Sequence, residues 1–183
     1  MKNIGIIGSG IMGSGIAQVA AQSGFQVLLS DLDSEALERA VSGIGERLAR
    51  AAERGRLEEP VDQVLGRIKT VPDFKNFASR DIVIEAISEQ EDIKCRLFSE
   101  LDRICPESTV LASNTSSISI TNIGAATRHP QRVVGMHFFN PVPLMPLVEV
   151  IPGAATSSQT VEKIKRLGEH LGKTVVQAKD TPG

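Results

Sequence analysis

The sequence has little that would support a metal centre or a disulfide framework. Its only cysteines, Cys95 and Cys105, are too far apart for a C-x-x-C pair, and no histidines lie near them at metal-ligand spacing. We therefore expect no metal site. Two isolated thiols are typical of a chain in a reducing, cytoplasmic compartment, where buried cysteine packs as a small hydrophobic residue.

Long hydrophobic runs and an excess of basic charge are missing as well. No stretch reaches the ~18 apolar residues of a membrane span. Glycines interrupt the apolar segment after Lys2, whereas a signal peptide needs an unbroken apolar helix. The 20 basic and 22 acidic residues give a net charge of -2, so the chain carries no electrostatic footprint for nucleic acid. Any phosphate that it binds must be held by local geometry.

Short apolar runs alternate with helical patterns along the 183 residues, which suffice for one globular domain, 1–183, with an insertion. The expected strands are 3–7, 25–29, 81–86, 109–112, 133–136, 147–151 and 174–176, and the expected helices are 11–22, 91–104 and 158–171. This alternation predicts an α/β fold of the Rossmann type, with a doubly wound, mostly parallel sheet and helices on both faces.

A charged stretch from 33 to about 69 interrupts the alternation. Asp33 or Ser34 is suited to be a helix N-cap, and glutamates and arginines then alternate with alanine and leucine at helical spacing until a break near Gly55. The pattern predicts an inserted helical hairpin whose charges are mostly solvated.

A glycine loop, G-x-G-x-x-G, follows the first expected strand and opens the first expected helix. Gly8 can make the tight turn, Gly10 can let the backbone approach a pyrophosphate, and Gly13 can let the helix pack on the strand. The free N–H groups around Ile11 and Met12 can bind the anion without a basic side chain. We therefore expect a dinucleotide at this loop.

Asp31 follows the second expected strand, at about the ~20-residue distance where an acid hydrogen-bonds the adenine ribose. Its charge would repel a 2′-phosphate, and no arginine lies nearby in sequence to accept one. The cofactor is thus expected to be NAD and not NADP. A role in starting the next helix fits the neighbouring Asp33 better.

Polar residues capable of acid–base chemistry cluster later in the chain. His137 ends an expected strand, and Glu149 lies on the next one, so the return could bring the carboxylate beside the imidazole. Oxidation of an alcohol needs a base for the hydroxyl proton, and a histidine oriented by a carboxylate suits that step. Ser116 could help to hold the substrate oxygen. His129, in a polar loop, is expected to be solvated.

Taken together, these motifs resemble the L-3-hydroxyacyl-CoA dehydrogenase family, which includes bacterial 3-hydroxybutyryl-CoA dehydrogenases. The resemblance covers essentially the whole chain, and its most specific block is His-Phe-Phe-Asn-Pro. The segments that carry it are 8–17, 113–117, 137–143, 147–150 and 179–183.

The resemblance implies NAD-dependent interconversion of (S)-3-hydroxyacyl-CoA and 3-oxoacyl-CoA by hydride transfer. It implies that His137 is the catalytic base, that Glu149 pairs with it, and that Ser116 lies near the 3-oxygen of the substrate. It also places Asn140 in the same pocket, in contact with substrate and cofactor.

Further positions follow from the same resemblance. Glu89 and Lys94 match residues that contact the nicotinamide half of NAD. Arg54 and Arg50, in the helical insertion, fall near basic positions that meet the phosphates of the acyl-CoA substrate.

Family members continue beyond the Thr-Pro-Gly segment into a helical domain, which supplies a further catalytic asparagine and contacts for a homodimer. The sequence therefore predicts an NAD-binding domain that binds its cofactor and has low activity without that second domain. Two other functions stay open: a related NAD-dependent hydroxyacid or sugar-acid dehydrogenase, and a non-catalytic, crystallin-like relative.

Overall fold

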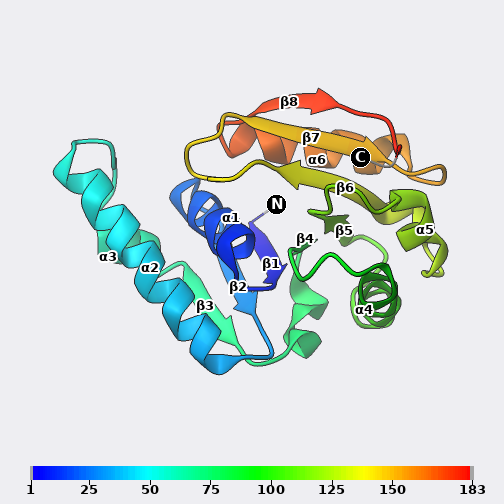
Figure 1. The fold of residues 1–183 in the computed structure, drawn as a ribbon, viewed down its shortest axis with the longest axis horizontal. Helices are drawn as coiled ribbons and strands as arrows, with labels where there is room; N and C mark the ends of the chain where they lie inside the picture. The colour runs from blue at the N-terminus through cyan, green and yellow to red at the C-terminus, as the bar shows by residue number, and fades with distance from the viewer. Residues whose placement is uncertain (1, 182–183) are drawn as a thin grey trace.

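A single eight-stranded sheet runs through the computed structural model, which describes residues 2–181 (Figure 1). Pro182 and Gly183, the end of the last motif, lie outside the described residues. The strand order is β3-β2-β1-β4-β5-β6-β7-β8, and every neighbouring pair is parallel except β6 and β7. The bounds are β1 Asn3–Ile7, β2 Gln26–Ser30, β3 Ile68–Val71, β4 Ile82–Glu85, β5 Val110–Ser113, β6 Val133–Phe138, β7 Leu147–Pro152 and β8 Thr174–Gln177.

Helices cover both faces of this sheet. The α-helices are α1 Ile11–Gln22, α2 Ser34–Glu53, α3 Val61–Leu65, α4 Glu91–Ile104, α5 Ile120–Ala125 and α6 Ser158–His170, and the 3-10 helices are η1 Phe74–Ser79 and η2 Pro130–Arg132. One apolar core joins α1, α2 and α6 to the sheet, and a second core joins α4, α5 and η1. The central strands send alternate side chains into the two cores, which is why β4 and β5 are apolar up to their last residue.

The sequence prediction of a Rossmann-type, mostly parallel sheet is confirmed. The first strand, the first helix and the helix of residues 91–104 have the expected bounds, and the other expected strands and the last helix differ from the observed bounds by one or two residues. Asp33 is the N-cap of α2, since its carboxylate accepts the amide of Glu35 at 2.9 Å. The helical insertion is also present, as α2 followed by the short α3 (Figure 1).

Several short elements were not expected. β3 was assigned in part to the insertion, because this four-residue edge strand is only half-buried and its sequence lacks an apolar run. The prediction for His129 was wrong: its ring lies between Asp102, 3.0 Å from Nδ1, and Glu107, 2.8 Å from Nε2. Within residues 2–181, no helix combines the length and the apolarity that a membrane crossing requires.

The strand order reverses between β1 and β4. The chain leaves β1 into α1 on one face of the sheet, and it leaves β4 toward α4 on the other face. Open α/β sheets bind ligands outside the carboxyl ends of the strands at such a point. The glycine loop, which follows β1, and the residues that follow β4 therefore lie at the edge where a ligand is expected.

Candidate active site

The loop from Gly8 to Gly13 is shaped by close backbone contacts. Gly8 has a φ of +97°, and a Cβ there would lie 2.5 Å from the carbonyl oxygen of Ala86. A Cβ on Gly13 would collide with the carbonyl oxygen of Gly8. Any side chain at either position would force the turn apart, so both glycines are needed for the turn itself.

Gly10 is different, because a Cβ there meets no described atom within 4 Å. The space outside Gly10 is open, and the first turn of α1 points its N–H groups toward it. Ile11, at the start of α1, is 75% exposed. This open space beside helical N–H groups fits a pyrophosphate, and the amides of Ile11, Met12 and Gly13 are the ones that could hold it.

A cavity of about 480 Å³ extends from the glycine loop over the ends of β1, β2 and β4. Asp31 lies on its wall, and two apolar side chains on the same wall, Leu32 and Ile93, are 95% and 40% exposed. Exposed apolar groups beside a carboxylate suit a flat, partly apolar ligand such as a nucleoside. Leu32 and Ile93 escaped the sequence analysis, because isolated exposed apolar residues have no sequence signature.

The Asp31 carboxylate is fixed by the glycine loop. Its Oδ2 accepts the amide of Ser9 at 2.7 Å and the Ser9 hydroxyl at 2.8 Å. Burial by itself would raise the pKa of Asp31, but these hydrogen bonds outweigh it and hold the pKa below its ordinary value. Asp31 is thus ionised near neutral pH, and its hydrogen bonds to Ser9 connect it to the glycine loop.

His137 and Glu149 are direct register partners in the antiparallel pair β6–β7. His137 Nδ1 lies 2.8 Å from Glu149 Oε2. Because a carboxylate can only accept, Nδ1 is the donor, and in the neutral imidazole the lone pair is therefore on Nε2. Within residues 2–181 no side chain or backbone group bonds Nε2, and the ring of Phe139 packs on the imidazole with centroids 4.7 Å apart. This arrangement fixes the orientation of the imidazole and which of its nitrogens donates to Glu149.

Ser116 lies in the loop after β5, and a single carboxylate orders that loop. Glu89 Oε1 accepts the amides of Ser116 and Ser117 at 3.0 and 3.2 Å and the hydroxyl of Thr115 at 2.5 Å. Burial would raise the pKa of Glu89, but the Thr115 hydroxyl and the nearby Lys94 charge hold it below its ordinary value. Glu89 therefore shapes the loop that carries Ser116.

Lys94 is buried behind Glu89 and does not reach into a cleft directly. Its side chain is 1% exposed, and its Nζ lies 2.5 Å from Glu85 and 3.3 Å from Glu89. The ammonium is thus separated from the exposed edge of the sheet by Glu89, which it contacts.

Ser116 and Glu149 line one cavity of about 210 Å³, together with residues of the segment after β8. Asn140, expected in the same pocket, lines a different cavity of about 390 Å³ beside Gly10. The reason is that the turn after Asn140 folds toward α1: a Cβ on Gly15 would lie 2.9 Å from Val142. The structure thus brings His137, Glu149 and Ser116 to one edge and sets Asn140 beside the glycine loop.

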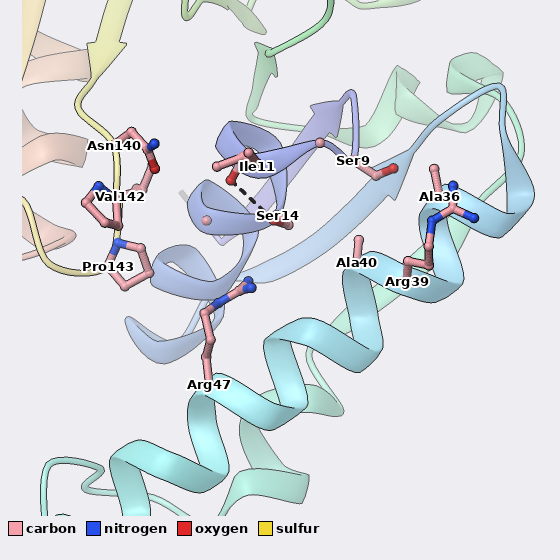
Figure 2. A pocket seen from close by; sticks show the side chains of 13 residues that line it. Ser9, Ile11, Ser14, Ala36, Arg39, Ala40, Arg47, Asn140, Val142 and Pro143 are labelled. Carbon is pink, nitrogen blue, oxygen red and sulfur yellow. Dashed lines mark hydrogen bonds between the residues drawn. The ribbon is translucent and has the colours of Figure 1, made fainter.

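Arg47 is a site residue that the sequence analysis missed. Figure 2 shows its guanidinium extending from α2 toward α1, with Asn140 and Pro143 across the cavity. Its Nε donates to Gln18 at 2.7 Å, while Nη2 is buried without a hydrogen-bond partner among the described residues. Burial first, and the charge of Arg50 second, lower its pKa. In sequence it looked like one more solvated charge of the insertion.

The two expected arginines of the insertion lie near Arg47. Arg50 and Arg54 line a cavity of about 410 Å³ with Arg47 and Arg56, and the apolar wall of that cavity includes Leu144. Leu144 is 74% exposed. A group of arginines beside an exposed apolar surface is chemically suited to a ligand that carries phosphates on an organic body.

Comparisons with known proteins agree with this geometry. The family model described as 3-hydroxyacyl-CoA dehydrogenase, NAD binding domain, matches residues 3–181. A probable 3-hydroxybutyryl-CoA dehydrogenase of Bacillus subtilis is 50% identical over 184 residues, covering 100% of this chain and 64% of the relative. The chain therefore spans about two thirds of that protein.

Solved structures give the same result. The crystal structure of 3-hydroxybutyryl-CoA dehydrogenase from Escherichia coli K12 superposes with a TM-score of 0.97 at 48% identity, over 100% of this chain and 39% of that one. The (S)-3-hydroxybutyryl-CoA dehydrogenase of Ralstonia eutropha gives a TM-score of 0.97 at 40% identity, over 100% of this chain and 65% of that one. The chain belongs to the family of NAD-binding domains of 3-hydroxyacyl-CoA dehydrogenases.

Proposed function

We propose that this domain serves an NAD-dependent dehydrogenase that interconverts (S)-3-hydroxyacyl-CoA and 3-oxoacyl-CoA. The observation that carries the proposal is the His137–Glu149 pair, whose carboxylate shares a cavity with Ser116 at the same edge of the sheet as the glycine loop. The names of the relatives support the substrate class.

His137 acts as the base in this proposal. The 3-hydroxyl proton moves to Nε2, and Glu149 stabilises the imidazolium through Nδ1. The Ser116 hydroxyl holds the substrate oxygen as its C–O bond becomes a carbonyl. When bound, NAD would accept the hydride from C3, the carbon that carries the hydroxyl. The substrate thus loses one hydride to NAD and one proton to His137. In the reverse direction, the imidazolium returns the proton to the oxygen.

The cofactor-binding residues in this proposal follow the edge of the sheet. The amides of Ile11, Met12 and Gly13 at the N-terminus of α1 would hold the pyrophosphate, and Asp31 would accept the ribose hydroxyls. Asn140, beside Gly10, and Glu89 would contact the nicotinamide half, and the buried Lys94 would act on it through Glu89. The pyrophosphate contacts are backbone amides, so they add no net charge to the site.

The acyl-CoA phosphates are proposed to bind the arginines of α2. Arg50 lies in the last turn of α2 and Arg54 is the C-cap of this helix. Arg47 lines the same cavity, and its buried Nη2 donates no hydrogen bond to any described residue. Leu144, on the same cavity, offers apolar surface to the organic part of the ligand. Phosphate oxygens would satisfy the guanidinium groups with charge-assisted hydrogen bonds.

We also propose that the 183-residue chain by itself turns over slowly, and that the complete enzyme is a cytoplasmic homodimer. The first part rests on length, because the chain spans 64% of the Bacillus subtilis relative and 65% of the Ralstonia eutropha structure. A kcat for the isolated chain equal to that of such a relative would refute it.

The experiment is NAD-linked oxidation of (S)-3-hydroxybutyryl-CoA, followed by NADH absorbance, with the protein of the full reading frame. His137→Gln should lower kcat by roughly 10²–10⁴. The control is His170→Gln, because His170 packs on Phe25 away from the described site. An inactive wild type, or a fully active His137 variant, would refute the proposal.

A further inference from the structure

One buried carboxylate near the site has no role in the mechanism above. Glu85 is the last residue of β4, and its side chain is fully buried. It accepts the Lys94 ammonium at 2.5 Å, the Ser113 hydroxyl at 2.6 Å and the Ile87 amide at 2.8 Å. All of its known partners lie on β5, on α4 and on the connection between β4 and α4.

Lys94 connects this carboxylate to the site. Its Nζ lies between Glu85 at 2.5 Å and Glu89 at 3.3 Å. Glu89 in turn accepts the amides of Ser116 and Ser117. A continuous set of polar contacts thus runs from the end of β4, through α4, to the loop of Ser116.

We propose that Glu85 is a positioning residue for the dehydrogenase, acting through Lys94 and Glu89 on the Ser116 loop; this inference rests on the proposed function. The ammonium of Lys94 is almost fully buried and needs a carboxylate. Glu85 supplies it, so that Glu89 can direct its Oε1 to the loop. Without Glu85, Lys94 draws Glu89 inward and the Ser116 and Ser117 amides lose their acceptor.

A purely structural role for the pair makes a different prediction. Replacement of a buried ion pair by uncharged groups of similar volume is often neutral for stability. If Glu85 and Lys94 only fill the core, the double variant Glu85→Gln with Lys94→Met should behave as wild type at the site. If they position Glu89, this double variant should fold normally and still have a loosened Ser116 loop, because Glu89 loses the ammonium that lies 3.3 Å away.

The test uses two readouts that do not depend on turnover. The first is hydrogen exchange at the amides of Ser116 and Ser117, and the second is the NADH dissociation constant from cofactor fluorescence. We expect exchange to be faster by about tenfold and NADH binding to be weaker by about fivefold in the double variant and in Glu85→Gln.

Asp102→Asn is the matched control. Asp102 is a buried carboxylate at the other end of α4, where it pairs with Arg132 at 2.8 Å. Its loss should lower stability and leave both readouts unchanged. The double variant keeps the inference testable if Glu85→Gln alone fails to fold.

The outcomes are separable. Wild-type exchange and NADH affinity in a folded double variant would overturn the positioning role and leave the proposed function intact. A wild-type protein that binds no NADH would refute the proposed function instead, while the exchange rates would still test the link from Glu85 to Ser116.

Discussion

Replacing Gly10 with alanine should separate cofactor binding from folding. Gly10 has φ -62° and ψ -168°, which any residue can adopt, and an added Cβ meets no described atom within 4 Å. Loss of chain entropy in the unfolded state favours alanine by ~0.4–1 kcal/mol, whereas alanine is the poorer N-cap by a few tenths or more. The free energy of unfolding should therefore change by less than about 1 kcal/mol.

Cofactor affinity should respond much more strongly. The methyl group would occupy the open space at the N-terminus of α1, where the pyrophosphate must approach the backbone. Overpacking of such a contact costs ~1–3 kcal/mol, which corresponds to a dissociation constant raised by about fivefold to about 150-fold.

The assay and its controls use features of this chain. The sequence has no tryptophan and no tyrosine, so the protein adds almost no fluorescence of its own to the NADH signal. For the same reason, unfolding in urea is followed by circular dichroism. Gly45→Ala, in the interior of α2, should stabilise by ~0.5–1 kcal/mol and leave NADH binding unchanged. Gly13→Ala should destabilise strongly, because its Cβ collides with the Gly8 carbonyl.

Two results would refute this reasoning. Wild-type NADH affinity in Gly10→Ala would mean that the cofactor does not approach this backbone. A loss of stability as large as that of Gly13→Ala would mean that the space outside Gly10 is not open in the folded protein.

Two further results are expected. Arg47→Met should raise KM for the acyl-CoA about tenfold, with NADH affinity unchanged; an unaltered KM would remove Arg47 from the substrate site. Burial would raise the pKa of Asp102, but Arg132 and His129 hold it far below its ordinary value, so its contribution to stability is full above ~pH 4 and declines as pH falls through the lowered pKa. Urea unfolding at pH 7 and pH 3 should therefore show a smaller pH dependence for Asp102→Asn than for wild type.

The fold was largely predictable because its signals are local. A buried parallel strand needs an apolar run, and a helix on its face needs apolar residues at helical spacing, as in Ile82–Glu85 and Glu91–Ile104. β3 was missed because an edge strand can form without an apolar run. Its place in the sheet comes from pairing with β2, which is a tertiary property.

The candidate site was predictable where chemistry and register coincide. His137 and Glu149 are direct partners of an antiparallel pair, so a strand prediction and a carboxylate on the returning strand were enough to place them together. Arg47 was not predictable in this way. Its neighbours in sequence are other charged residues, and only the packing of α2 against α1 distinguishes it from them.

The polar residues at the ends of the central strands have one physical feature in common. Glu85 ends β4, Ser113 ends β5 and His137 lies next to the end of β6, and each bonds a polar side chain of a neighbouring element. Burial of such groups costs free energy unless their partners are fixed, so each one specifies a single arrangement of the elements around it. A glutamate that closes an otherwise apolar buried strand therefore requires a partner of opposite charge, and the structure supplies Lys94 in the first turn of the next helix. This requirement joins the fold to the site, because the cation that satisfies Glu85 is also the one that holds Glu89.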